Sequence, residues 1–376
     1  MKLVVSRLSI GDIVSRVNIL SFLIDFCLNI FFISVRSFFN FFANKEHRIV
    51  IISLHRLGDT IFTIPAIREL QIQSNEKLSI VCFPESVPIY KLAFDDVDFC
   101  ELKHNDFHFN DRFAKRLARK KVKSLKPGIV LDLIGGMSSA SLIFSSRAQK
   151  VVGISQKNFR SIFNNFVQIR SKPKLTDIYY DAVSTLIKID DRERMKNSFD
   201  SFNPKGKILI HPFAAWREKE WSLKKFCELA VRLKKDYKVQ IVSPVGIISQ
   251  DIKKEIIEAG IEITESKSVD ELIQAIKKCS IFIGNDSGPI NIANFIGKPT
   301  FSIYGGTNPD YTASVHTHQP FIQKKLGCSA GTDEKFCLVG GAEFYCSGKQ
   351  CMSFLSGDEV YKSVLRLAEK HCNKIN

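Results

Sequence analysis

The stretch IFIGNDSGPINIANFIGKPTFSIYGG, residues 281–306, decides the fold. Its two apolar runs predict strands at 280–284 and 299–304, and the segment between them predicts a helix at 288–296. Both strands are apolar almost without interruption, which is typical of parallel strands covered on both faces by helices. The stretch therefore predicts part of an α/β domain with a parallel sheet.

The same alternation extends over the second half of the chain. Further strands are predicted at 207–211, 239–243 and 261–264, and further helices at 222–236, 249–258 and 268–278. Together with the first stretch they make a doubly wound α/β unit, in which ligands bind at the carboxyl ends of the strands.

The first half of the chain repeats this pattern. An apolar strand at 48–54 is followed by a polar, Gly-containing loop at 55–60 and a helix at 61–71. Additional strands are predicted at 78–83, 128–133 and 150–153, with a basic helical stretch at 112–126. Two such units in tandem place a cleft between the carboxyl ends of two sheets.

A charged connection with Asn, Pro and Gly, at 189–206, separates the two units and predicts the domain boundary. We expect four parts. They are an amphipathic N-terminal segment (1–45), a first Rossmann-like domain (46–200), a second Rossmann-like domain (201–356) and a C-terminal helix (357–376).

The chain is strongly basic. Its 376 residues include 54 Lys and Arg against 39 Asp and Glu, a formal charge of +15, which favours a phosphate-bearing partner. The basic residues concentrate at 112–126, as a binding patch or as a solvated helix face. We expect no nucleic-acid partner, because no recognised nucleic-acid-binding module accompanies the charge.

Ten cysteines are too few for a disulfide scaffold of this length, so most are expected to be reduced cytoplasmic thiols. Cys328, Cys337, Cys346 and Cys351 share one Gly-rich region. Their spacing lacks the C-x-x-C pairs of zinc sites, and whether they bind metal, pair or stay free is left open.

Residues 18–42 are rich in Leu, Ile and Phe and resemble a membrane segment at first sight. The polar residues Asn18, Ser21, Asp25, Asn29, Arg36 and Asn40 nevertheless fall on one narrow stripe of a helix. This pattern favours a helix lying in a membrane interface with its polar stripe in water. The alternative is a helix packed on its own domain or on a second copy.

Three loops at strand ends carry the candidate chemistry. In 284–289, Asp286, Ser287 and Gly288 precede a helix whose N-terminus suits a diphosphate, although a simple helix cap is the competing interpretation. Gly305 and Gly306 end the next strand at the same sheet edge and favour the phosphate interpretation.

The second loop, 211–222, contains Arg217 and Lys219, two cations suited to diphosphate oxygens. Its Trp216 is suited to packing on a sugar or a base, whereas Trp221 is expected to be a core residue.

The third loop, 55–60, contains Asp59, whose carboxylate is suited to remove a proton from the hydroxyl group of a substrate that accepts a transferred group. Its competing role is to cap the helix that follows. His55 is as suited to a structural hydrogen bond as to proton transfer.

Taken together, Arg56-x-Gly58-Asp59-Thr60-x-x-x-x-Pro65-Ala66, Lys219-x-Trp221 and Asp286-Ser287-Gly288-Pro289 with Gly-Lys-Pro at 297–299 resemble the ADP-heptose:lipopolysaccharide heptosyltransferases of glycosyltransferase family 9. The motifs match in order and spacing over residues 46–370. The chain differs from the family at Asn291, where His is frequent, and at Ala214 and Ala215, where hydroxyl residues are frequent.

The resemblance implies a GT-B fold and an inverting transfer of heptose from ADP-heptose to a lipopolysaccharide core or related glycolipid, with no metal and no cofactor. By it, Asp59 is the base, Arg56 contacts the acceptor, and the donor is held by Lys219, Arg217, Asp286, Ser287, Gly288 and Gly305. It implies an anionic glycolipid partner and a cytoplasmic enzyme peripherally associated with the inner membrane.

Two alternatives to a heptosyltransferase stay open. One is a GT-B transferase that adds another nucleotide-activated sugar to O-antigen or capsule, and the other is an inactive membrane-associated scaffold. The retained Asp59 and Lys219 argue against the scaffold. A nicotinamide oxidoreductase is disfavoured because no G-x-G-x-x-G follows a predicted strand.

Overall fold

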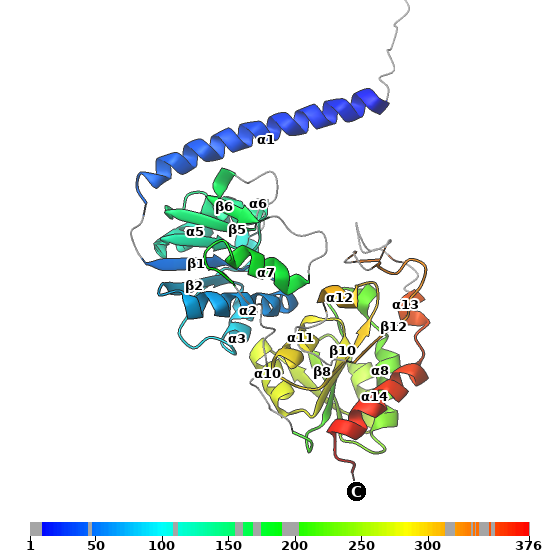
Figure 1. The fold of residues 1–376 in the computed structure, drawn as a ribbon. Coiled ribbons are helices and arrows are strands. Elements are labelled where there is room, and N and C mark those ends of the chain that lie inside the picture. Colours follow the sequence, from blue (N-terminus) through cyan, green and yellow to red (C-terminus); the bar gives the residue numbers. More distant parts are fainter. Residues whose placement is uncertain are drawn as a thin grey trace, which may run out of the picture.

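The computed structural model describes residues 10–43, 47–107, 112–154, 161–167, 174–189, 203–312, 320–331, 334, 336–337, 346 and 350–375. Within these residues the chain forms two α/β domains and one long N-terminal helix (Figure 1). The expected domain boundary at residues 200 and 201 lies outside the described residues.

The first domain contains a six-stranded parallel sheet in the order β3-β2-β1-β4-β5-β6. Its strands are β1 (Arg48–Ile52), β2 (Lys77–Cys82), β3 (Asp98–Glu101), β4 (Ile129–Asp132), β5 (Lys150–Ile154) and β6 (Asn165–Val167). Its helices are α2 (Leu57–Gln73), η1 (Pro84–Ser86), α3 (Val87–Tyr90), α4 (His104–Phe107), α5 (Arg112–Ser124), α6 (Met137–Ile143) and α7 (Leu175–Val183). This strand order is that of a doubly wound dinucleotide-binding fold.

The second domain repeats the topology, with strand order β12-β11-β10-β7-β8-β9 and every pair parallel. Its strands are β7 (Ile208–His211), β8 (Val239–Pro244), β9 (Glu262–Ser266), β10 (Ile281–Asn285), β11 (Thr300–Tyr304) and β12 (Phe321–Gln323). Its helices are η3 (Arg217–Lys219), α8 (Leu223–Leu233), α9 (Gln250–Glu258), α10 (Val269–Lys278), α11 (Gly288–Phe295), α12 (Pro309–Thr312), α13 (Gln350–Ser353) and α14 (Gly357–His371). The predicted doubly wound architecture is therefore confirmed in both halves.

The core follows the strands. Strands β1 and β4 and strands β7, β10 and β11 are almost completely buried, as expected for a parallel sheet with helices on both faces. One apolar cluster continues from the first domain into the second, through Ile61 and Ile64 of α2 and Ile290 and Ala293 of α11. The two domains are thus packed together, rather than being joined only by a linker.

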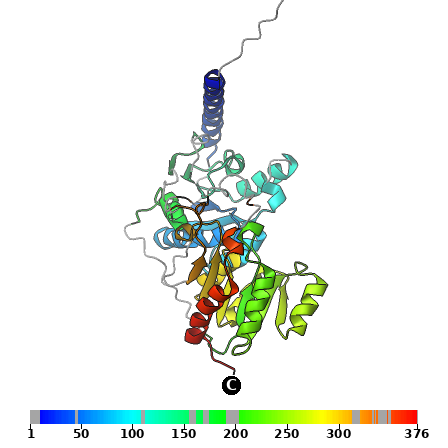
Figure 2. The same cartoon turned by 90° about the vertical axis from the view of Figure 1, so that its right-hand side faces the viewer.

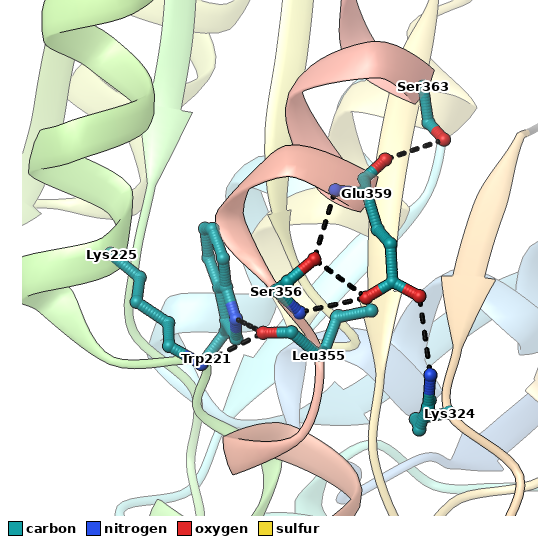
Figure 3. Close-up of polar contacts among 7 residues, drawn as sticks. All are labelled: Trp221, Lys225, Lys324, Leu355, Ser356, Glu359 and Ser363. Carbon is teal, nitrogen blue, oxygen red and sulfur yellow. Dashed lines mark hydrogen bonds and ion pairs between the residues drawn. The ribbon is translucent and has the colours of Figure 1, made fainter.

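The C-terminal helix α14 belongs to the second domain, where it packs along α8 (Figure 2). Ser356 and Glu359 form a capping box at its start, and Lys225 and the indole of Trp221 both donate to the carbonyl of Leu355 (Figure 3). Trp221 is completely buried, which confirms its expected role in the core.

The N-terminal helix α1 (Ile10–Asn40) begins earlier than the predicted helix and lies on the side of the first domain that faces away from the second domain (Figures 1 and 2). The expectation that its polar stripe faces water is wrong at Arg36. This side chain is only 7% exposed and donates to Asn164 Oδ1 at 3.2 Å. The stripe therefore faces the protein at this position, because the Arg36 guanidinium finds a partner on the first domain. The side chains of Asn18, Ser21, Asp25 and Asn40 lie outside the described residues.

Candidate active site

The three motif loops lie at the points where the strand order of each sheet reverses. Strand β1 pairs with both β2 and β4, and β7 pairs with both β8 and β10, so the loops after β1, β7 and β10 line the two crevices. Gly284 of β10 pairs with His211 of β7, and a Cβ on Gly284 would lie 2.8 Å from the His211 carbonyl oxygen. Because Gly284 has no side chain, β10 lies close to β7, and the motif loops that follow these two strands are brought together.

A pocket of about 590 Å³ lies between the domains. The first domain contributes residues 56–58 and the region of Pro84 and Glu85, and the second contributes residues 213–215, 266–270 and 287–289. The N-termini of α2, α10 and α11 all reach this pocket, and the backbone N–H groups of a helix N-terminus favour negative charge. The pocket thus suits an anionic ligand of nucleotide size.

Lys219 and Asp286 form an ion pair. The ammonium group of Lys219 lies 2.7 Å from Asp286 Oδ2, which also accepts a 2.6 Å hydrogen bond from Thr307. The Asp286 side chain is 4% exposed and that of Lys219 is 16% exposed. Asp286 therefore holds Lys219 in place and does not cap α11, and the lysine keeps two further N–H donors for a ligand.

Trp216 joins a predicted acceptor residue to a predicted donor residue. The Lys219 ammonium lies 4.7 Å from the centre of its ring, and the Arg56 guanidinium of the first domain lies 5.7 Å from it. Both contacts have the geometry of cation–π interactions. The structure thus brings Arg56, Trp216 and Lys219 together, with Arg217 exposed two residues before Lys219 in η3.

Ser287 is the N-cap residue of α11, yet its side chain makes no capping bond. Its hydroxyl is buried, has no hydrogen-bond partner among the described residues, and belongs to a residue that lines the pocket. The interpretation of this loop as a simple side-chain cap is therefore wrong. A buried hydroxyl of this kind is suited to bind a ligand.

Gly288 and Gly305 are both crowded by protein atoms. A Cβ on Gly288 would lie 3.0 Å from Leu57 Cβ and 3.2 Å from the Gly58 nitrogen. A Cβ on Gly305 would lie 3.2 Å from the Glu218 carbonyl oxygen and 3.3 Å from Met352. Gly288 thus permits the contact between the domains, and Gly305 permits the packing of η3 and α13, in addition to any contact with a donor.

Asp59 lies in the first turn of α2, which begins at Leu57, so the expected capping role is wrong. Burial and the negative charge of Asp59 raise the pKa of Tyr311, which comes from α12 of the second domain. The same two causes raise the pKa of Tyr179 of α7. Asp59 thus lies among groups from both domains, although it is not among the residues that line the pocket.

His55 is next to Asp59 in this arrangement. Its ring packs edge-on against Tyr179, with 5.2 Å between the ring centres. Burial lowers the pKa of His55 to about 4, although Asp59 and a hydrogen bond to the Leu133 backbone act in the opposite direction. The imidazole is therefore neutral near pH 7, which excludes it as a cationic contact for the donor.

Two residues of the site were missed by the sequence analysis. The Asn285 side chain is fully buried, accepts from the Trp221 backbone N–H at 3.0 Å and donates to the Pro212 carbonyl at 2.8 Å, so it ties two motif loops together. Thr307 holds Asp286 from the next strand end. Asn285 stands inside the quoted motif, whereas nothing in the sequence distinguishes Thr307.

No group of three or more His, Cys, Asp or Glu within the described residues is placed to hold a metal ion. Cys328, Cys337, Cys346 and Cys351 are free thiols in the structure. Burial and the charges of the other three cysteines raise the pKa of Cys351, so the four lie within electrostatic reach of one another.

Comparison with known proteins points to one family. The model of "Glycosyltransferase family 9 (heptosyltransferase)" matches residues 116–338. A lipopolysaccharide heptosyltransferase 1 of Campylobacter coli is 32% identical over 122 residues, and a lipooligosaccharide heptosyltransferase 2 of Haemophilus influenzae is 30% identical over 81 residues. These matches cover 30% and 21% of this chain, and only 35% and 23% of the two relatives.

Solved structures share the fold over most of the chain. A family 9 glycosyltransferase from Veillonella parvula superposes with a TM-score of 0.66 at 18% identity, covering 86% of this chain and 97% of that one. Escherichia coli ADP-heptose lps heptosyltransferase II gives a TM-score of 0.65 at 15% identity, with coverages of 86% and 99%. Escherichia coli heptosyltransferase WaaC, solved with ADP, gives 0.63 at 15% identity, with coverages of 85% and 99%.

Proposed function

Because the chain belongs to glycosyltransferase family 9 and has a GT-B fold, we propose that it transfers heptose from ADP-heptose to an anionic glycolipid such as a lipopolysaccharide core. The observation that carries this proposal is the pocket between the domains, with the Lys219–Asp286 pair and the unpartnered Ser287 hydroxyl beside it. The inactive scaffold is disfavoured because these groups are positioned rather than lost.

In the proposed reaction the donor nucleotide occupies the pocket with its diphosphate near the start of α11. Ser287 donates its hydroxyl hydrogen to a phosphate oxygen, and Lys219 supplies the opposing charge. Arg217, exposed beside Lys219, is the second cation of this loop. Asp286 keeps the ammonium group in position throughout, so that no side chain has to reorganise when the leaving group gains charge.

Asp59 acts as the general base. Its carboxylate takes the proton of an acceptor hydroxyl as that oxygen attacks the anomeric carbon of the heptose. The bond between the anomeric carbon and the diphosphate oxygen breaks, and ADP leaves with the electron pair on the face opposite to attack. Configuration at the anomeric carbon is therefore inverted. Arg56, held against Trp216, contacts the negative groups of the acceptor.

A second candidate is the transfer of another nucleotide-activated sugar to O-antigen or capsule. Ala214 and Ala215 line the pocket at positions where hydroxyl residues were expected from the resemblance, and this change favours a donor with different contacts. In both cases the acceptor is proposed to lie in the inner membrane, with the enzyme on the cytoplasmic side.

The test is turnover by the purified full chain. ADP-heptose, UDP-glucose and UDP-N-acetylglucosamine are each offered with an extracted core glycolipid, and the glycolipid mass is followed by mass spectrometry. We expect a mass gain of one heptose with ADP-heptose alone. A gain only with a UDP-sugar supports the second candidate, and no gain with any donor on several core glycolipids overturns both.

A further inference from the structure

The outward side of α1 is apolar. Its exposed large side chains are Leu23, Ile24, Phe26, Ile30, Phe31, Ile33 and Phe38, each between 49% and 63% exposed. At 100° per residue they cover an arc of roughly 180° on the side away from Arg36. We call this set the outer apolar face. Phe41 and Phe42 extend it just beyond the helix, at 85% and 47% exposed.

The opposite side of α1 contacts the first domain near the C-terminal end of the helix. Phe32 packs against Phe144, with 6.3 Å between the ring centres, and Arg36 donates to Asn164. Arg36 is buried deeply enough for its pKa to fall to about 10. Since these contacts determine the rotation of the helix, the outer apolar face cannot turn inward without breaking them.

Cations surround the domain-bound end of the helix. The Lys123 ammonium lies 5.8 Å from the centre of the Phe39 ring, and the Arg147 guanidinium lies 5.5 Å from that of Phe42. On α5 and the turn after it, Arg116, Lys120, Lys121 and Lys126 are exposed, and residues 112–131 contain no acid. The apolar surface is therefore continuous with a cationic one.

We propose that the outer apolar face lies in the plane of an anionic lipid bilayer, with its aromatic side chains among the acyl chains and the α5 cations at the headgroups. Charge complementarity selects this partner, because an apolar helix flanked by exposed Lys and Arg matches an anionic lipid surface. None of the helices in the described part of the chain combines the length and hydrophobicity that a membrane crossing requires. An in-plane arrangement satisfies both observations.

This arrangement places the first domain between the membrane and the second domain (Figures 1 and 2). The inference that this contact brings the domain bearing Asp59 to a lipid-embedded acceptor rests on the proposed function. The lipid contact itself does not depend on that function, and it is measured without any donor or acceptor.

The first experiment is co-sedimentation of the full chain with vesicles of phosphatidylethanolamine and phosphatidylglycerol. The variant Ile30→Gln/Ile33→Gln/Phe38→Gln changes the outer apolar face. The control, Ile72→Gln/Ile247→Gln/Ile257→Gln, changes apolar residues that are 57% to 71% exposed elsewhere. We expect the first variant to bind at least tenfold more weakly and the control to bind like wild type. Equal binding of all three proteins overturns the proposal.

The second experiment measures insertion directly. Phe38→Trp places an indole on the outer apolar face, and Phe39→Trp places one a single residue later, beside Lys123. Lipids brominated in their acyl chains should quench Phe38→Trp much more than Phe39→Trp or the wild-type protein, whose tryptophans are Trp216 and Trp221. Equal quenching of the two variants contradicts an ordered outer face.

Two further measurements test the role of the α5 cations and distinguish a lipid bilayer from a second copy of the chain. Lys120→Gln/Lys121→Gln should weaken binding at low salt and lose its effect at high salt, because exposed charges are screened. If wild type is a dimer that the Ile30/Ile33/Phe38 variant dissociates, and neither binds vesicles, the occupant is a second copy and the proposal fails. Turnover on a delipidated acceptor in solution, measured on the same variants, reports on the proposed function independently.

Discussion

At the scale of single residues, the proposed chemistry depends most on Asp59. Replacing it with Asn should lower turnover by about a thousandfold, ~4 kcal/mol in barrier, because an amide cannot accept the acceptor's proton. Affinity for ADP should stay within about twofold, since the proposed donor contacts lie in the other domain. Steady-state kinetics and calorimetry measure the two quantities.

The matched control is Asp251→Asn. Asp251 is also an acid in the first turn of a helix, α9, so this variant removes the same favourable interaction with a helix dipole away from the site. It should keep wild-type turnover. If Asp59→Asn retains more than about a tenth of wild-type turnover, Asp59 is not the base.

Two buried histidines predict loss of stability in mild acid. Burial lowers the pKa of both His55 and His211 from 6.5 to about 4. Between these values the unfolded chain is protonated while the folded chain is not, so the free energy of unfolding decreases as the pH falls from 6.5 toward 4. The loss is at most about 3 kcal/mol per histidine. Urea denaturation at pH 7 and pH 5 measures it.

Asp132 acts in the opposite direction. It is fully buried, and burial raises its pKa from 3.8 to about 6, so its contribution to stability is complete below pH 3.8 and is lost as the pH rises through 6. His211→Gln should therefore reduce the acid-induced loss of stability, whereas Asp132→Asn should increase it. The same pH dependence in both variants and wild type would show that neither group is linked to folding.

At the scale of elements, the contact between α2 and α11 sets the relative position of the two domains. Gly288→Ala places a methyl group 3.0 Å from Leu57 Cβ and 3.2 Å from the Gly58 nitrogen, and backbone cannot yield as a side chain can. We expect the contact to shift and turnover to fall by about tenfold, because small displacements of reacting groups are costly. Kinetics and small-angle scattering test this.

Gly357→Ala is the control for that variant. Gly357 is also the first residue of a helix, α14, and a Cβ there meets nothing within 4 Å. Its turnover and scattering should equal those of wild type. Wild-type behaviour of Gly288→Ala as well would mean that the domains do not need this close approach.

The elements that the sequence predicted are those with long apolar runs. The nine strands β1, β2, β4, β5, β7, β8, β9, β10 and β11 were located to within about two residues at most ends, because apolar periodicity records burial directly. Strands β3, β6 and β12 were missed: they are only three to four residues long, and none of their residues is fully buried. Helices α6 and α7 were also missed; α6 is rich in Ser, and most of α7 is buried, so neither has a clear polar face.

The sequence supplied the candidate residues of the site but not the contacts between them. Asp286 and Lys219 were expected to act separately on a donor, yet they form an ion pair across 67 positions of sequence. The polar stripe of α1 was expected to face water, yet Arg36 faces the first domain, because periodicity identifies a face without saying what covers it. Such contacts depend on how the strands are ordered in space.

At the scale of the whole molecule, the two domains repeat one topology. In the proposed function the second domain contributes Lys219, Ser287 and the start of α11, while the first contributes Arg56 and Asp59. The pocket takes its walls from both domains, so the proposed donor binding and catalysis depend on the packing of the domains against each other.

Calorimetric titration of ADP and UDP into the full chain and into Lys219→Gln tests the proposed donor site. We expect one site per chain that binds ADP more tightly than UDP, and at least about tenfold weaker ADP binding in the variant, because the donor diphosphate loses its held cation. Equal ADP affinity in the two proteins, or tighter binding of UDP by wild type, would contradict this expectation.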